Sequence, residues 1–126
     1  MTEQELKDRT KAFALRVLKL IDTLPNSRSG RVLAGQLGRS GTSVGANYRS
    51  ACRSRSIAEM ISKLSVVEEE ADESGFWMEL IAGHGLMSAA KMAPLMKEAG
   101  ELTAIMVASR KTLLSNNRKS RIQNRK

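Results

Sequence analysis

Residues 39–56, RSGTSVGANYRSACRSRS, decide the fold, because their composition and their spacing point in opposite directions. Serine, glycine, threonine and asparagine are typical of a loop. Yet apolar residues recur at helical spacing before and through this stretch. They are Leu33, Leu37, Val44, Tyr48 and Ala51. The spacing therefore predicts a helix that begins near Arg28 or Gly30 and contains the whole run up to Ala51.

Three glycines of this helix follow the same period, at Gly38, Gly41 and Gly45. Each glycine inside a helix costs roughly 0.5–1 kcal/mol relative to alanine, so something must offset about 2–3 kcal/mol. A flexible Gly/Ser linker, the alternative interpretation, predicts no period at all. We therefore expect Gly38, Gly41 and Gly45 to provide close helix packing, where a neighbouring helix approaches nearer than usual.

Three further helices are predicted from apolar periodicity and from helix start and stop signals. The first covers Glu3 to Leu24 and is closed by Pro25. The next runs from Ser56 to Ala82, where Ser56 and Glu59 match a capping box. The last runs from Ala89 or Pro94 to Leu114, and Pro94 favours a start near its own position. Four helices joined by short turns predict an all-α, antiparallel up-down-up-down four-helix bundle.

Residues 1–116 are assigned to this bundle, and residues 117–126 form a basic C-terminal tail without an apolar period. We expect the tail to be frayed or disordered, or ordered only by a partner.

Charge is segregated along a chain whose formal net charge is +8. Residues 39–55 and 110–126 carry basic residues without any acid. Residues 59–79, in contrast, carry seven acidic residues and one basic residue, Lys63. Such an excess favours polyanionic partners, nucleic acid first. The side chains expected to contact phosphate are Arg39, Arg49, Arg53, Arg55, Arg118, Lys119, Arg121 and Arg125. The alternative is that the arginines of residues 39–55 pair with the acidic block, within one chain or between chains.

Signals of catalysis and of cofactors are missing from the sequence. The single histidine, His84, lies between two glycines and has no nucleophile or metal-ligand pattern beside it. The single cysteine, Cys52, excludes an intrachain disulfide and a Cys-based zinc site. No apolar run is long enough to span a membrane, and no signal peptide is visible. We expect a cytoplasmic protein that is not an enzyme and that holds no metal and no cofactor.

The run QLGRSGTSVGANYRSACRSRSIAEMISKLSVVEEEADESGFWMELI, residues 36–81, resembles the four helix bundle protein family, also called the 23S rRNA intervening-sequence proteins. The segments AFALRVLKLIDTLP and EAGELTAIMVASRKTL are similar as well, so the resemblance covers roughly residues 5–115. Ser50 stands where the family commonly has Glu, and Val67-Glu68-Glu69 replaces a more apolar and basic segment. Local charge pairing therefore departs from the family pattern.

The resemblance implies an antiparallel four-helix bundle that assembles as a homopentameric ring. It also implies a relative, the accessory variability determinant of diversity-generating retroelements, which binds nucleic acid and a reverse transcriptase. We therefore expect an oligomeric protein that binds nucleic acid, RNA in preference to DNA, through phosphate contacts, with a reverse transcriptase as a partner by remote resemblance. The competing expectation is a structural scaffold whose arginines pair with the acidic helix across subunits.

Overall fold

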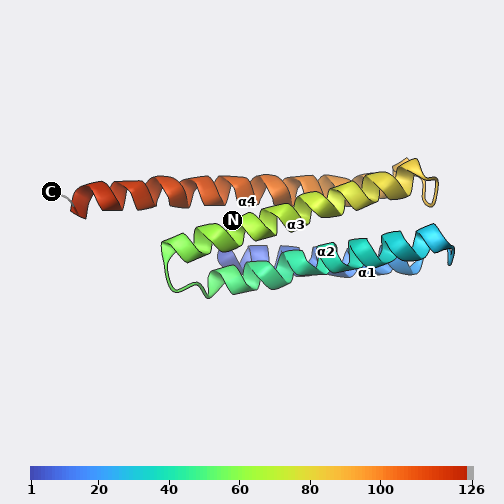
Figure 1. Cartoon of the computed structure of the whole chain (residues 1–126), viewed down its shortest axis with the longest axis horizontal. Coiled ribbons are helices and arrows are strands. Elements are labelled where there is room, and N and C mark those ends of the chain that lie inside the picture. Colours follow the sequence, from blue (N-terminus) through green and yellow to red (C-terminus); the bar gives the residue numbers. More distant parts are fainter. Residues whose placement is uncertain (125–126) are drawn as a thin grey trace.

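The computed structural model describes residues 1–124 and contains four long helices within that range. They run alternately up and down, and each packs against its neighbours in the chain, while α1 closes the bundle on α4 (Figure 1). Their bounds are α1 Glu3–Asp22, α2 Arg28–Cys52, α3 Ile57–Gly83 and α4 Ala89–Asn124. The prediction of an all-α up-down four-helix bundle is confirmed, and the run of residues 39–52 is helical.

Two of the helices begin at capping serines, Ser27 and Ser56, of which Ser56 is the one that the sequence indicates. The Ser27 hydroxyl accepts a hydrogen bond from the Gly30 N–H at 3.0 Å and caps α2. Ser56 caps α3 by accepting from the Glu59 N–H at 3.1 Å. The Glu59 carboxylate accepts from the Arg55 N–H and not from Ser56, so only half of the predicted capping box is present. Both caps satisfy N–H groups that have no partner inside the helix.

The last helix begins earlier than Pro94 suggests. The Ser88 hydroxyl accepts a hydrogen bond from the Lys91 N–H at 3.3 Å, so α4 starts at Ala89 and Pro94 lies inside it. Proline leaves one carbonyl, that of Ala90, without its helical N–H donor. Both residues are exposed, so water satisfies this carbonyl at little cost.

The same helix ends ten residues later than expected, at Asn124 instead of Leu114. Residues 117–124 continue α4 without a break, so the expectation of a frayed or disordered tail is wrong for them. Extending an existing helix adds one hydrogen bond per residue, and the segment contains no glycine or proline that would stop it. Arg125 and Lys126 lie outside the described residues.

The first and second helices approach each other closely along the three glycines. A β-carbon built on Gly41 would lie 2.8 Å from both methyl carbons of Val17, which is fully buried. At Gly38 the same atom would lie 3.1 Å from the Ile21 side chain, and at Gly45 3.4 Å from Thr10. The glycine side of α2 therefore faces α1 of the same chain, where it makes room for the branched side chains of that helix.

Ion pairs between helices link the other three interfaces of the bundle. Arg9 donates to both carboxylate oxygens of Glu98, at 2.8 and 2.7 Å, and so ties α1 to α4. These bonds hold the pKa of Glu98 below its ordinary value. The three pairs join Arg9 to Glu98, Arg39 to Glu73, and Arg110 to Glu68. A buried hydrogen bond of 2.9 Å, from Ser74 to Ser40, adds a polar contact between α3 and α2.

Candidate nucleic-acid interface

The C-terminal end of α2 presents three arginines to solvent. Val44, Tyr48 and Ala51 face the core, so helical geometry turns Arg49 toward the outside. Arg53 forms the C-cap, and Arg55 lies in the turn before α3. All three arginines are exposed, and none makes an ion pair with the acids among residues 1–124.

The C-terminal part of α4 carries the second basic group. It projects beyond the α2–α3 turn at the same end of the bundle (Figure 1). Helical spacing places three exposed residues on one side of this segment, Lys111, Arg118 and Ile122. This side is about half a turn away from the buried Leu102 and Met106. Arg118 and Lys119 line a shallow hollow of about 300 Å³ on this side. Arg121 is exposed on a neighbouring side of the same segment.

The two basic groups therefore share one end of the molecule without forming one flat face. Each helix packs on its chain neighbours, so α2 and α4 lie diagonally across the bundle, with α3 between them on one side. Their outer sides consequently point in different directions. A polyanion that contacts both groups must wrap around the end of the bundle. We name these six side chains the basic end: Arg49, Arg53, Arg55, Arg118, Lys119 and Arg121.

Arg39 has a different environment from the other candidate contacts. Its guanidinium donates to Glu73 at 2.7 Å and to Glu70 at 3.3 Å, both on α3. The sequence left open whether the arginines of residues 39–55 pair with the acidic block. Within one chain of the described structure, Arg39 is the one of them that does so. The signal in the sequence is the three-residue spacing of Glu70 and Glu73, which places both carboxylates on one side of α3.

The remaining acids of the block divide between paired and open positions. Glu68 accepts a hydrogen bond from Arg110 at 3.1 Å, whereas Glu69 and Asp72 are exposed. Arg110 heads the basic C-terminal segment in the sequence, yet it is half-buried against α3. Sequence reasoning did not anticipate this pair, because the two residues are 42 positions apart.

Base stacking has no aromatic platform at the basic end. Tyr48 is only 4% exposed, and burial raises the pKa of its phenol. Phe76 and Trp77 lie in the other half of α3, where their rings contact each other in a tilted arrangement with centroids 5.2 Å apart. The arginines and lysine of the basic end are therefore expected to contact phosphates, because side chains of this kind make most protein contacts to the nucleic-acid backbone.

The described residues contain neither a metal site nor a membrane span. Among residues 1–124, no three His, Cys, Asp or Glu side chains gather as metal ligands would. No helix in this part of the chain is both long and apolar enough to cross a bilayer. His84 is exposed at the C-cap of α3, at the opposite end of the bundle from the basic end.

Comparisons with known proteins place this bundle in one class. The family model described as 23S rRNA-intervening sequence protein matches residues 2–108, so the chain belongs to that family. A crystal structure of a protein with unknown function from the S23 ribosomal protein family of Bacteroides thetaiotaomicron is 31% identical, with a TM-score of 0.82. The match covers 88% of this chain and 99% of that one. Among curated proteins the comparison finds no match. Residues 109–124, which include half of the basic end, lie beyond the family match.

Proposed function

We propose that the protein is a non-enzymatic, oligomeric nucleic-acid-binding protein that contacts RNA phosphates through its basic end. One observation carries the proposal: the side chains of Arg49, Arg53 and Arg55 are exposed and make no ion pair among the described residues. An arginine free in this way presents a planar set of donors that matches two phosphate oxygens.

The remaining features of the proposal rest on the family. RNA is preferred over DNA because the family description names 23S rRNA. A ring-like homo-oligomer, with five copies, follows from the family resemblance, as does the reverse transcriptase as a remote candidate partner. Ring assembly would bring several basic ends together and strengthen phosphate binding through multivalency.

One observation favours a second candidate function, a structural or protein-interaction scaffold. Arg39 already pairs with Glu70 and Glu73, and two acids of the same block, Glu69 and Asp72, are exposed. In a scaffold these acids would receive Arg49, Arg53 or Arg55 from a neighbouring copy. The two functions differ in what salt does, because a scaffold binds no RNA at any salt concentration.

The test is RNA binding measured by fluorescence anisotropy at 50 and 200 mM salt. If all six side chains of the basic end contact single-stranded RNA, the affinity should fall by about two to three orders of magnitude between these concentrations. Replacing Arg49, Arg53 and Arg55 with glutamine should flatten the logarithmic salt slope by about 2.

The matched control removes the same charge at the other end of the bundle, by Lys19→Gln, Lys91→Gln and Lys97→Gln; all three lysines are exposed. The control should keep most of the slope. Binding that barely responds to salt, or that weakens equally in both triple variants, would refute the assignment of the basic end.

A further inference from the structure

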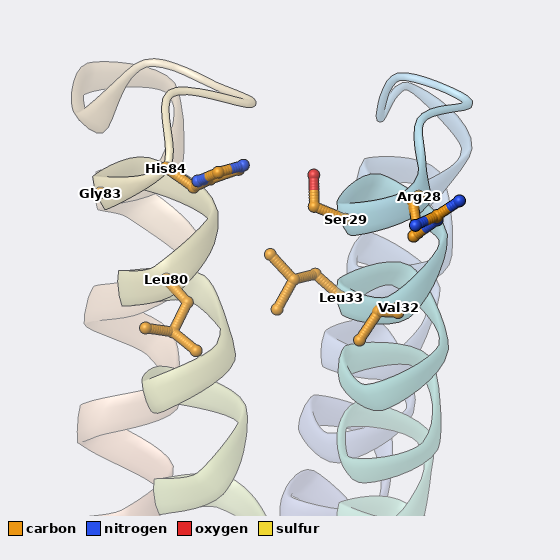
Figure 2. A pocket seen from close by; sticks show the side chains of 7 residues that line it. All are labelled: Arg28, Ser29, Val32, Leu33, Leu80, Gly83 and His84. Atoms are coloured by element: carbon orange, nitrogen blue, oxygen red, sulfur yellow. The ribbon is translucent and has the colours of Figure 1, made fainter.

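An apolar hollow lies between α2 and α3 at the end of the bundle opposite the basic end. Its volume is about 780 Å³, and Leu33 and Leu80 project into it between the two helices (Figure 2). Val32 is 58% exposed and Leu80 39% exposed, which is unusual for large apolar side chains so close together. Arg28 and His84 lie at its outer end, so the hollow is apolar inside and polar at the rim.

A second apolar surface without a partner runs along the outer side of α1. Leu15 is 51% exposed and Leu18 is 41% exposed. Lys11 precedes them and Asp22 follows them, all at helical spacing on one side. Neither Lys11 nor Asp22 takes part in an ion pair within residues 1–124.

The two surfaces have the same spacing and complementary chemistry. The hollow side of α2 carries Arg28, Val32, Gly35 and Arg39, at steps of four, three and four residues. The outer side of α1, taken backwards, carries Asp22, Leu18, Leu15 and Lys11 at the same steps. Each series spans about 16.5 Å along a helix axis. On α2 the series begins with a basic residue and an apolar one, continues with a glycine and ends at the ion-paired Arg39. On α1 it begins with an acidic residue, continues with two leucines and ends with a lysine.

Laid antiparallel, the two series match at the first three positions, and at the fourth Lys11 would lie opposite Arg39, whose charge is already paired with Glu73. Asp22 would meet Arg28, and Leu18 would cover Val32. Leu15 would lie over Gly35, where no atom lies within 4 Å of the place that a β-carbon would occupy. At the far end, Lys11 would meet the carboxylate of Glu73, which already lies beside Arg39.

We infer that α1 of a second copy of this chain docks along the α2–α3 hollow in this antiparallel register. The two surfaces belong to different sides of one bundle, because α1 faces its own α2 with its other, buried side. Every copy therefore offers one hollow and one α1 surface, and the contact is head-to-tail. The inference rests on the oligomeric part of the proposed function and is independent of its RNA-binding part.

The test is light scattering of purified variants after size separation, with helicity checked by circular dichroism. One variant carries Val32→Glu and Leu80→Glu and lacks the hollow; the other carries Leu15→Glu and Leu18→Glu and lacks the α1 surface. We expect the wild type to be an assembly and each variant alone to have the mass of one chain. Mixed in equal amounts at high concentration, the two variants should form a 1:1 dimer, since one intact hollow and one intact α1 surface remain. Ile57→Glu, at a residue 43% exposed elsewhere on α3, should keep the wild-type mass.

Variants that keep the wild-type mass, or a mixture that stays monomeric where the wild type is assembled, would overturn the inference and leave the oligomer itself standing. A monomeric wild type would overturn both the inference and the oligomeric part of the proposed function. Charge exchange supplies a measurement that does not alter the apolar surfaces. Arg28→Asp alone should reduce the assembled fraction, and adding Asp22→Arg should restore it; failure of that rescue also counts against the register.

Discussion

Replacing Gly41 with alanine separates helix propensity from helix packing. The added methyl group would lie 2.8 Å from both Val17 methyl carbons, so these atoms must retreat by about 0.6 Å to reach ordinary contact. Val17 is fully buried and β-branched, which leaves it few other rotamers. Alanine gains about 1 kcal/mol in helix propensity, but overpacking costs about 1–3 kcal/mol. We expect a net destabilisation of about 1 kcal/mol, and a larger loss for Gly41→Leu.

Urea denaturation followed by circular dichroism, at one fixed protein concentration, measures this difference. The matched control is Gly100→Ala, because Gly100 is an exposed glycine inside α4 with open space around it. The control should raise the free energy of unfolding by about 0.5–1 kcal/mol. In a Val17→Ala background Gly41→Ala should destabilise less than it does in the wild type, since both methyl carbons at 2.8 Å are gone and only the β-carbon of residue 17, at 3.1 Å, remains. If Gly41→Ala stabilises the wild-type protein as much as Gly100→Ala does, the Val17 methyl carbons do not restrict this position.

Three more predictions concern polar contacts and the C-terminal segment. Arg9→Gln should destabilise the fold by about 1–2 kcal/mol at pH 7, because Glu98 is mostly buried and loses its cation. Arg9 lowers the folded-state pKa of Glu98, so the ion pair stabilises the fold fully above the unfolded-state pKa of about 4.3. This stabilisation is lost as the pH falls through the folded-state pKa. Urea melts at pH 7 and pH 3 should therefore show the difference in unfolding free energy between Arg9→Gln and wild type becoming smaller at pH 3. Ser74→Ala should cost about 1 kcal/mol in the same assay by leaving the buried Ser40 hydroxyl without its donor, and adding Ser40→Ala should cost less than a second independent loss. Deleting residues 115–126 should leave the melting temperature nearly unchanged, because the side chains of residues 115–123 are mostly exposed, while RNA affinity measured by anisotropy falls; a large drop in melting temperature would contradict this.

The helices were predictable because their apolar periods are long. In α2 the period from Leu33 to Ala51 passes through four glycines, and it outweighs a composition typical of loops. The end of α4 was not predictable in the same way, since residues 115–123 have no buried side and therefore no apolar period. A helix that simply continues past its packed part leaves no such signal in the sequence.

The candidate site was predictable in composition but not in arrangement. Counting charges identifies Arg49, Arg53 and Arg55, and these residues are exposed as phosphate contacts require. The sequence does not show that Arg39 is held by two carboxylates of α3, because that pairing depends on how α2 and α3 align. Nor does it show that α4 carries its basic residues past the end of the bundle.

The overhang of α4 has an electrostatic consequence. Arg110 is paired with Glu68, and Arg121 lies eleven residues further along the same helix, about 16.5 Å away along its axis. At physiological ionic strength charges are screened over about 8 Å, so Glu68 and the acids that follow it on α3 are about two screening lengths or more from the tip of α4 and do little to neutralise it. An approaching polyanion therefore meets a locally unopposed positive tip, and the acids that moderate the net charge of the whole molecule matter little at the point of first encounter.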